Sequence, residues 1–202
     1  MSYLKKVKTL IKNFTFFKDY FRILEIKIPI TLKQYIQFKL YNKNKKIYWP
    51  VHPRSIVSGN VKVGINSSVG ATPGCYIQGI GEVVVGDYTL IGPNVGIISA
   101  NHDSMDYRKH VGKKVIIGNY CWIGMNSTIL PGVTLGNHTI VGAGSVVTKS
   151  FEEGYCVIAG NPAKIVKKFS EDERIDYKDK YEYYGYIPKQ KFKQYKKKNL
   201  SK

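Results

Sequence analysis

The sequence has no long apolar run. No stretch approaches the roughly 18 uninterrupted apolar residues of a membrane-spanning helix. The N-terminal segment is rich in lysine, lacks an apolar signal region and is not followed by a small-residue cleavage site, so it does not look like a secretion signal. We therefore expect a cytoplasmic protein, with peripheral association at the inner face of the membrane as an alternative.

Cysteine is scarce, and its arrangement excludes several chemistries. The chain has three cysteines and no CxxC pair, so neither a disulfide framework nor a thiol-based metal site is indicated. Cys75 and Cys121 stand at positions that suit small buried groups, and we expect all three thiols to be reduced and structural. The serine-nucleophile motif GxSxG is also absent, which disfavours an acyl-enzyme intermediate.

Acidic side chains are few. The chain has 14 of them against 32 lysines and arginines, which gives a formal net charge of +18. The net charge is +10 in residues 1–50, +3 in residues 51–150 and +5 in residues 151–202. Basic ends attract polyanions or anionic lipid surfaces, so association with an acidic glycan or an anionic membrane is one interpretation. A merely solvated surface is the other, and we expect no nucleic-acid partner.

The sequence contains a repeat with a period of six residues. Counted in sixes with two breaks, the same slot holds aliphatic residues and one cysteine: Val51, Val57, Val63, Val69, Cys75, Val85, Ile91, Ile97, Ile117, Ile123, Ile129, Leu135, Val141 and Val147. Neither an α-helix nor an alternating strand has this period. A short fixed period indicates one structural unit stacked many times. Stacking would bury each aliphatic side chain, at about 1.5–3 kcal/mol before entropy, and would pair the backbones, so the pattern predicts a parallel β-helix.

Two steps break the period. The step from Cys75 to Val85 contains a four-residue insertion around Ile80. The step from Ile97 to Ile117 is too long for a simple unit, so residues 98–114 are expected to project from the coil. Loops that project from a rigid scaffold are common places for functional sites.

The N-terminal region has a helical pattern instead. Residues 1–28 carry apolar side chains at a spacing of three to four, with lysines between them, which predicts a basic amphipathic helix that ends at Pro29. Thr31 and Gln34 form a capping-box pattern that opens a second helix to about Leu40. The first helix could pack on its own repeats, on a neighbouring subunit or on an anionic membrane, and the sequence leaves these alternatives open.

Several motifs in the repeats resemble the hexapeptide-repeat acyltransferases. They are the hexads themselves, the Asn101-His102-Asp103 loop, and the runs 115–124, 129–133, 141–148 and 159–164. The chain looks most similar to the sugar and polysaccharide O-acetyltransferase branch, over residues 51–168. The resemblance implies a left-handed parallel β-helix with helical extensions at both ends, a homotrimer with active sites between subunits, acetyl-CoA as donor and a carbohydrate acceptor. It implies no metal.

This resemblance suggests a division of the chain. We expect a basic helical extension over residues 1–50, an acyltransferase domain over residues 51–168, and a basic C-terminal helix and tail over residues 169–202. Ser170 and Glu173 form a capping-box pattern that predicts a helix over residues 171–184. The segment from Lys189 onward, with consecutive like charges, is expected to fray.

Acetyl transfer to a hydroxyl needs a group that takes up the hydroxyl proton. His102 in the projecting loop is the candidate general base, because an imidazole titrates near neutral pH and the resembling enzymes place such a histidine here. The alternative is a simple turn residue. Asp103 could orient the imidazole or form an Asx turn, and Asn101 could bind the acceptor.

The resemblance also supplies candidates for binding the donor and the acceptor. Trp122 corresponds to a tryptophan that flanks the catalytic cleft, where it could line the pantetheine or the sugar site. Further contacts with coenzyme A are expected from these residues: Ser127, Gly142, Ala143, Pro162, Lys164 and Lys167. Small residues would let the pantetheine arm approach the backbone, and the lysines could meet its phosphates.

Other functions are weighed against this one. A hexapeptide-repeat carbonic anhydrase would need three histidines around zinc, but His52, His110 and His138 stand far apart in the sequence. N-acetylation of an amino sugar is a second possibility, although residues 1–50 contain no glycine for the nucleotide-binding turn of such relatives. A non-catalytic trimeric β-helix that binds polyanions is the third. Direct acetyl transfer to a glycan hydroxyl fits the motifs best.

Overall fold

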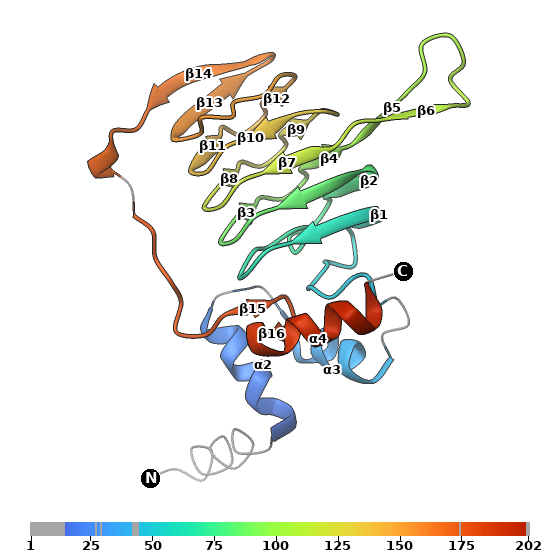
Figure 1. Ribbon diagram of the computed structural model, residues 1–202, viewed down its shortest axis with the longest axis vertical. Coiled ribbons are helices and arrows are strands. Elements are labelled where there is room, and N and C mark those ends of the chain that lie inside the picture. The colour runs from blue at the N-terminus through green and yellow to red at the C-terminus, as the bar shows by residue number, and fades with distance from the viewer. Residues whose placement is uncertain (1–14, 27, 29, 42–44, 174, 201–202) are drawn as a thin grey trace.

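The computed structural model describes residues 15–26, 28, 30–41, 45–173 and 175–200. Figure 1 shows stacked coils of strands, one hairpin that projects far from them, and a base formed by segments from both ends of the chain. The helix expected for residues 1–28 is described only from residue 15, and its first half lies outside the described residues.

The strands of the coils pair in parallel. One sheet has the order β10-β7-β2-β4-β9-β12, with β1 paired to β2, and the other has the order β14-β13-β11-β8-β3. Their bounds are β1 Ile56–Val63, β2 Tyr76–Val85, β3 Leu90–Ile91, β4 Gly96–Ile98, β7 Val115–Ile117, β8 Trp122–Ile123, β9 Thr128–Ile129, β10 Thr134–Leu135, β11 Thr139–Val141, β12 Val146–Val147, β13 Cys156–Gly160 and β14 Ala163–Lys168. Only β14 runs antiparallel to its neighbour in these sheets. The fold is the expected β-helix with helical extensions.

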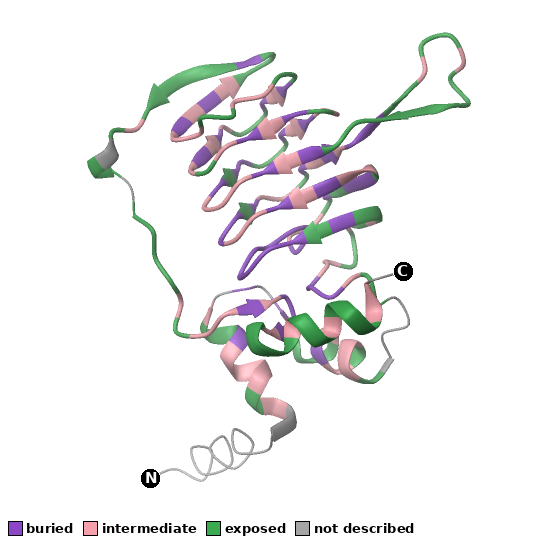
Figure 2. Ribbon diagram, viewed as in Figure 1, coloured by how far each residue is buried: buried purple, intermediate pink, exposed green. Residues whose placement is uncertain are grey.

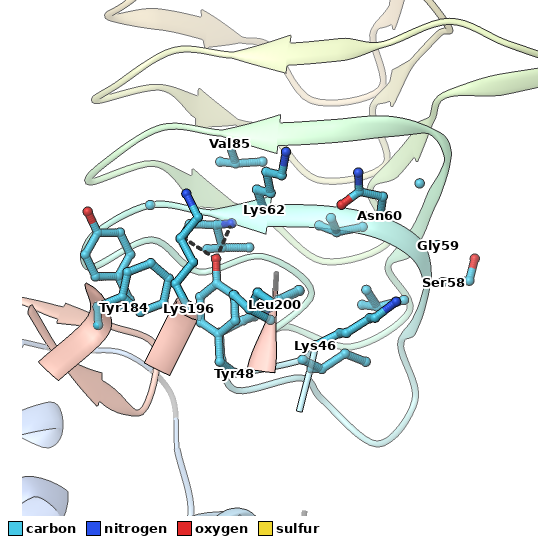
Figure 3. Close-up of a pocket in the computed structure, with 18 of the residues that line it drawn as sticks. Lys46, Tyr48, Ser58, Gly59, Asn60, Lys62, Val85, Tyr184, Lys196 and Leu200 are labelled. Carbon is cyan, nitrogen blue, oxygen red and sulfur yellow. Dashed lines mark hydrogen bonds between the residues drawn. The ribbon is translucent and has the colours of Figure 1, made fainter. Parts of the chain in front are cut away.

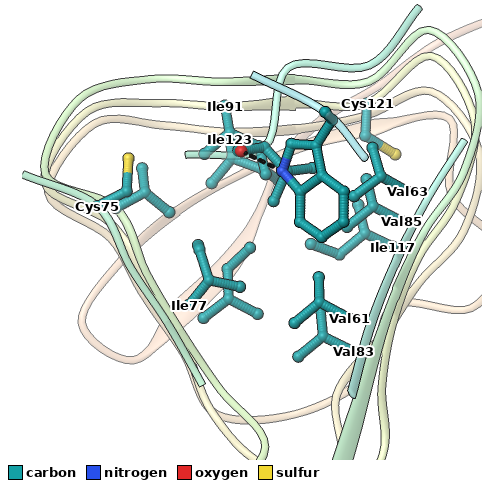
Figure 4. Packing of buried hydrophobic residues seen from close by; sticks show 14 of the residues in the cluster. Val61, Val63, Cys75, Ile77, Val83, Val85, Ile91, Ile117, Cys121 and Ile123 are labelled. Carbon is teal, nitrogen blue, oxygen red and sulfur yellow. Dashed lines mark hydrogen bonds between the residues drawn. The ribbon is translucent and has the colours of Figure 1, made fainter. Parts of the chain in front are cut away.

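The repeat positions become buried columns inside the coils. One column stacks Val57, Ile77, Ile97, Ile129 and Val147 through the strand registers. A second stacks Val63, Val85, Ile117 and Leu135, and a third stacks Ile91, Ile123, Val141 and Ile158. Figure 4 shows the lower parts of these columns meeting in the interior. Nearly all of these side chains are buried, which is why the period of six persists in the sequence.

Cys75 does not occupy the column position that the count of six assigned to it. Ile77 pairs with Val57 below and Ile97 above, so it is the column residue. Cys75 lies two residues earlier, in the same slot as Cys121, and both thiols point to carbonyl oxygens, at 3.3 Å from that of Gly92 and 3.2 Å from that of Gly136. The four extra residues are therefore divided between two corners of the coil, because the steps from Val69 to Ile77 and from Ile77 to Val85 are eight residues each. Two of the extra residues precede Cys75.

The slot that Cys75 and Cys121 occupy holds a small hydrogen-bond donor in most coils. Most other coils fill it with a buried serine or threonine whose hydroxyl donates to a backbone carbonyl oxygen: Ser67, Thr89, Ser127, Thr139 and Ser145. A buried carbonyl needs a donor, and a small hydroxyl or thiol supplies one at each corner without adding bulk. This explains the small fifth residue of each hexad.

Described segments from the N-terminal and C-terminal parts of the chain pack together under the coils. The N-terminal part contributes α2 (Thr15–Glu25) and α3 (Leu32–Tyr41), and the C-terminal part contributes the β15 (Tyr183–Tyr184) and β16 (Ile187–Pro188) hairpin and α4 (Lys189–Asn199). Ile23 and Tyr35 are fully buried, and the rings of Phe38 and Tyr186 stack at 4.2 Å. Over its described residues the first helix packs on α3 and on the C-terminal segment, with the Tyr20 ring 5.4 Å from the Tyr35 ring and the Tyr183 hydroxyl 2.9 Å from the Asp19 carboxylate. The three alternatives named for the whole helix stay predictions. None of the described helices is both long enough and apolar enough to cross a membrane.

Two capping boxes were predicted from the sequence, and only the one in the N-terminal part is followed by an α-helix in the structure. Thr31 and Gln34 form the reciprocal capping box, with nitrogen-to-oxygen distances of 2.8 and 3.2 Å. Ser170 and Glu173 also pair, at 2.8 Å, but the helix expected over residues 171–184 is wrong. Of the residues described there, Glu171–Glu173 form a short 3-10 turn, η1, and Tyr183–Tyr184 belong to the strand β15. The segment from Lys189, expected to fray, is the helix α4.

The segment that was expected to form a helix over residues 171–184 is instead held extended by an aromatic ladder on one corner of the coils. Its rings stack from coil to coil at 4.9 to 5.2 Å, and each ladder residue has positive φ: Tyr88, Tyr120, His138 and Tyr155. The extended chain after η1 runs down this ladder. Tyr177 packs edge-on against it, and Asp176 lies 2.7 Å from the His138 ring. These contacts hold the segment straight, and Figure 1 shows it descending from η1 to β15.

Candidate functional site

The projecting segment is an antiparallel hairpin. Its strands are β5 (Ala100–His102) and β6 (His110–Gly112), with His102 paired opposite His110. Figure 1 shows that it leaves the coils between β4 and β7 and extends well beyond them. Figure 2 colours most of it as exposed. The hairpin therefore presents its side chains outside the body of one chain.

The turn of the hairpin is built around Asp103. Its Oδ1 atom accepts hydrogen bonds from the backbone N–H groups of Met105, at 2.8 Å, and Asp106, at 3.0 Å. These two bonds lower the pKa of the Asp103 carboxyl. This is an Asx turn. The turn that the sequence allowed for Asp103 is therefore present, and its role in orienting His102 stays a prediction.

The partner of the His102 ring is a backbone carbonyl group. The Nδ1 atom of His102 contacts the carbonyl oxygen of Tyr107. Since a carbonyl oxygen only accepts hydrogen bonds, Nδ1 carries the proton in the neutral ring and Nε2 keeps a free lone pair. The rings of His102 and His110 lie 4.5 Å apart, and His102 is exposed. The arrangement leaves one ring nitrogen able to take a proton at the surface.

The foot of the hairpin is tied to the coils below by Glu82. Its carboxylate contacts the ammonium group of Lys62 in β1 and that of Lys114, just after β6, the latter at 2.9 Å. Asn60 adds a hydrogen bond of 3.0 Å. These cations lower the pKa of Glu82 to about 2. Glu82 thus links the first two coils to the hairpin.

Glu82 holds this position at a conformational cost. Its φ is +77°, a region that favours glycine and is strained for a residue with a Cβ atom. A glycine there would relieve the strain but lose every contact to Lys62 and Lys114. Sequence reasoning missed Glu82, because a single glutamate inside an insertion carries no motif.

A second missed residue is Gln78. Gln78 is 8% exposed. Among the buried side-chain oxygen and nitrogen atoms of the described residues, its Oε1 atom is the one that has no hydrogen-bond partner. Its Nε2 group lies 3.5 Å from the carbonyl oxygen of Ala100, where the hairpin begins. Such an orphaned acceptor is costly unless a ligand or water supplies a donor.

Trp122 lies elsewhere on the coils. It is 56% exposed on β8, with Leu90 and Ile140 as its neighbours on the adjacent strands. Figure 1 shows β8 on the side of the coils away from the hairpin. A single chain therefore does not bring Trp122 and His102 together.

The residues expected to bind coenzyme A gather around the upper coils. Gly142 lies next to Ala159, since a Cβ atom built on Gly142 would be 3.0 Å from the Cβ atom of Ala159. Ala159 in turn pairs with Lys164 across β13 and β14. Ala143, the residue after Gly142, is exposed. Pro162, in the turn between β13 and β14, is exposed as well. The structure thus gathers much of this set on one part of the surface.

Two members of the set are less available. The Ser127 side chain is fully buried and donates to the Gly142 carbonyl oxygen at 2.9 Å, so its hydroxyl faces the interior of the coil. Lys167 is paired with Glu173 at 2.8 Å. Lys164 is exposed on β14. Lys164 is therefore the better placed of the two lysines for a phosphate group.

The remaining histidines do not meet. His52 precedes β1, His110 lies in the hairpin and His138 belongs to the aromatic ladder. Within the described part of the chain, no three side chains of the metal-binding types form a group that could hold an ion.

Comparison with known sequences identifies the repeat. The family model described as bacterial transferase hexapeptide (six repeats) matches residues 114–149. Nodulation protein L of Rhizobium meliloti (strain 1021) is 44% identical over 79 residues, which cover 35% of this chain and 43% of that protein. Nodulation protein L of Rhizobium leguminosarum bv. viciae is 40% identical over 79 residues, which cover 35% and 42%. The chain thus spans less than half the length of these curated relatives.

Solved structures extend the similarity over most of the chain. A maltose O-acetyltransferase from Clostridium difficile 630 is 27% identical, with a TM-score of 0.50, and the match covers 79% of this chain and 91% of that one. A galactoside acetyltransferase in complex with coenzyme A is 24% identical, with a TM-score of 0.59, and the match covers 82% and 86%. The second likeness shows that the two chains share a fold.

Proposed function

The chain carries the hexapeptide repeats of bacterial transferases on a fold shared with acetyltransferases, and from this premise we propose that it is an acetyl-CoA-dependent O-acetyltransferase. The acceptor we propose is a hydroxyl of a sugar or a surface polysaccharide. The match to the bacterial transferase hexapeptide model and the maltose O-acetyltransferase support the class of enzyme, and the acceptor rests on the branch of the family that the motifs resemble.

One observation carries the proposal, namely the state of the His102 ring. Its Nδ1 atom is held by the Tyr107 carbonyl oxygen and its Nε2 atom is left with a lone pair, on an exposed hairpin. A histidine in this state is ready to act as a general base, because its tautomer and its orientation are fixed before the substrate binds.

The proposed reaction is a direct transfer. The Nε2 atom of His102 takes the proton of the acceptor hydroxyl while the hydroxyl oxygen bonds to the thioester carbonyl carbon. The carbon–sulfur bond then breaks, and the thiolate of coenzyme A receives the proton from the imidazolium. A positioned base of this kind contributes about 10²- to 10⁴-fold to the rate. The products are an O-acetyl ester and free coenzyme A.

The upper coils fit the donor. A Cβ atom added to Gly144 would find nothing within 4 Å, and its φ of +69° is one that glycine adopts readily. The backbone there is open to a slender group such as the pantetheine arm. Lys164 is placed to meet a phosphate, and the exposed Trp122 ring offers an apolar surface.

Because His102 and Trp122 lie apart in one chain, the proposed site needs a second copy. We propose a homotrimer in which the hairpin of one subunit reaches the upper coils of its neighbour. The hairpin has the form for this, since Met105 is 93% exposed and Tyr107 is 78% exposed near its tip. In the proposed trimer the neighbouring subunit covers these two side chains.

Gln78 is the residue we propose to contact the acceptor near the hairpin. A hydroxyl group of the acceptor would supply the donor that its buried Oε1 atom lacks. Asn101, exposed on β5, is the second candidate contact. A site that satisfies a buried acceptor in this way discriminates against acceptors without that hydroxyl.

The experiment for this proposal is an acceptor survey. The protein is incubated with isotopically labelled acetyl-CoA and a panel of glycans, while thiol release and the mass of each glycan are followed. We expect label in a bond that mild alkali cleaves, which identifies an ester. Label that resists alkali would indicate an amide and would replace O-acetylation by N-acetylation. Thiol release that no acceptor stimulates would contradict the proposal.

A further inference from the structure

A large open cavity lies at the base of the coils, beside β1 and away from the upper coils. Its volume is about 980 Å³, and α4 closes one side of it (Figure 3). Its lining includes Asn60 and Lys62 from β1, Tyr184 from β15, and Phe192 and Lys196 from α4. This size is at the upper end of the range of small-molecule sites, which is about 300–1,000 Å³.

The charge of the lining has one sign. Lys46, Lys62 and Lys196 line the cavity, and no aspartate or glutamate is among its lining residues. Lys62 is paired with Glu82, whereas the Lys196 ammonium makes no ion pair with a carboxylate of the described residues. Figure 3 shows the side chains of Lys62 and Lys196 extending in the same direction beside Tyr48. The cavity therefore favours an anion.

The wall beneath these cations is aromatic. The rings of Tyr184 and Phe192 stack at 3.8 Å with an angle of 12°, and the ring of Tyr48 lies 5.0 Å from Phe192. The Tyr48 hydroxyl is already engaged with the N–H and the carbonyl oxygen of Val63, so this wall is largely apolar. A ligand that fits has one apolar face and several anionic or hydroxyl groups, a combination that acidic sugars provide.

The cavity leads to the foot of the hairpin. Gly79 lines it, and Gly81, two residues on, donates its N–H to the Ser99 hydroxyl at 2.9 Å. Ser99 in turn accepts a hydrogen bond from the N–H of Lys113, just after β6, at 2.7 Å. One corner of the coils therefore joins the cavity to the segment that carries His102.

We propose that this cavity binds a carboxylate-bearing oligosaccharide segment of the acceptor, away from the hydroxyl that is acetylated. The proposal rests on the proposed function and makes it more specific, because it names an acidic glycan as the substrate class. Lys196 and Lys46 meet the carboxylates, and the Tyr184 and Phe192 rings support the apolar face of a sugar.

The test is a binding measurement with the full chain. Oligogalacturonide hexamers are compared with the neutral maltohexaose by isothermal titration calorimetry at low and high salt. We expect the acidic hexamer to bind and the neutral one to bind far more weakly. We expect Lys196→Gln to weaken binding about fivefold, as for an exposed charge pair, and to reduce its salt dependence. Lys46→Gln combined with Lys196→Gln should weaken it further.

The matched control is Lys193→Gln, since Lys193 is exposed on α4 and does not line the cavity. It removes the same charge and should leave the affinity unchanged. Equal loss in both lysine variants would mean general attraction by a basic helix and would overturn the proposal. So would equal binding of maltohexaose, or binding of a single-stranded RNA hexamer with the same dependence on Lys196.

A second readout separates this proposal from the proposed function. Coenzyme A is added alone and the melting temperature is measured. If coenzyme A shifts the melting temperature but Lys196→Gln does not alter glycan binding, the cavity proposal fails and the proposed function stands. If the acidic glycan binds through Lys196 but labelled acetyl groups reach no acceptor, the proposed function fails instead.

Discussion

His102 is held by Tyr107 across the turn of the β5–β6 hairpin, with the Nδ1 atom of the ring against the backbone carbonyl oxygen. The contact fixes the tautomer without using a carboxylate. It also makes the orientation of the ring depend on the shape of the turn rather than on a second catalytic side chain. Substitutions in the turn should therefore affect the reaction through geometry.

Asp103 provides the first test of this view. Asp103→Asn keeps an oxygen that can accept from the Met105 and Asp106 N–H groups, so the turn and the activity should be retained within about threefold. Asp103→Ala removes the acceptor and should lower kcat by about 10-fold or more, since the ring loses its defined position. Steady-state kinetics on both variants decides. A large loss in Asp103→Asn would instead support a carboxylate that orients His102.

Glu82 provides a prediction on pH. Its pKa, lowered to about 2 by Lys62 and Lys114, lies below the ordinary value of 4.5. The ion pairs therefore stabilise the folded protein fully above about pH 4.5, and this contribution is lost as the pH falls toward 2. Glu82→Gln should cost about 1 kcal/mol or less at pH 7, as expected for partly exposed pairs. Urea unfolding of both proteins measures the difference, which should shrink at pH 3.

The same variant should loosen the hairpin. Without the Glu82 carboxylate, Lys114 no longer ties the end of β6 to the coils. Trypsin should then cleave after Arg108 and Lys109 faster than in the parent protein. If the cleavage rate and the pH dependence of stability both match those of the parent protein, Glu82 does not anchor the hairpin.

The extended segment beside the aromatic ladder should contribute to stability and not to chemistry. Tyr177 packs edge-on against Tyr88 and Tyr120, at 5.2 and 5.5 Å. Tyr177→Ala should lower the free energy of unfolding by about 1–3 kcal/mol, from two aromatic contacts. Chemical denaturation measures this, and turnover at 25 °C should stay unchanged. A loss of turnover with full stability would show that the segment takes part in the reaction.

The cysteines should be unreactive in the folded protein. Burial raises the pKa of the Cys121 thiol to about 11 and raises that of Cys156 as well. Little thiolate is then present at pH 8, and access is blocked. A thiol reagent should label these residues slowly until denaturant is added. Rapid labelling of the native protein would show that the coil corners open.

The period of six was sufficient for the coils because a single physical requirement repeats at every step. Each column residue such as Ile97 or Ile129 must be apolar and buried, and nothing else satisfies that slot. The count failed at Cys75, because the insertion shifts the register by two residues and only pairing with the neighbouring coils identifies Ile77. Register across an irregular corner is a tertiary property.

In the C-terminal part of the chain, contacts with distant residues outweigh the structure that the local sequence predicts. Ser170 and Glu173 do form their cap, but the contacts of Tyr177 and Asp176 with the aromatic ladder favour an extended chain over a helix. In α4, the rings of Phe192 and Tyr195 pack against Tyr48, which offsets the like charges that predicted fraying. Both outcomes depend on partners far away in the sequence.

The candidate site was accessible from the sequence only in part. The long interruption predicted the hairpin and singled out His102, whereas Glu82 and Gln78 are visible only through contacts between coils and hairpin. The roles of the residues named from the resemblance remain proposals. Trp122 and His102 illustrate why, because their relation depends on a second subunit.

The most direct test of the account is His102→Gln, with Ser104→Ala as the control in the same exposed turn. Transfer of the acetyl group from acetyl-CoA to the glycan found in the survey is measured, together with the shift in melting temperature caused by coenzyme A. We predict that His102→Gln lowers kcat by about 10²- to 10⁴-fold and leaves the coenzyme A shift intact, while Ser104→Ala resembles the parent. Unchanged turnover in His102→Gln would contradict the account.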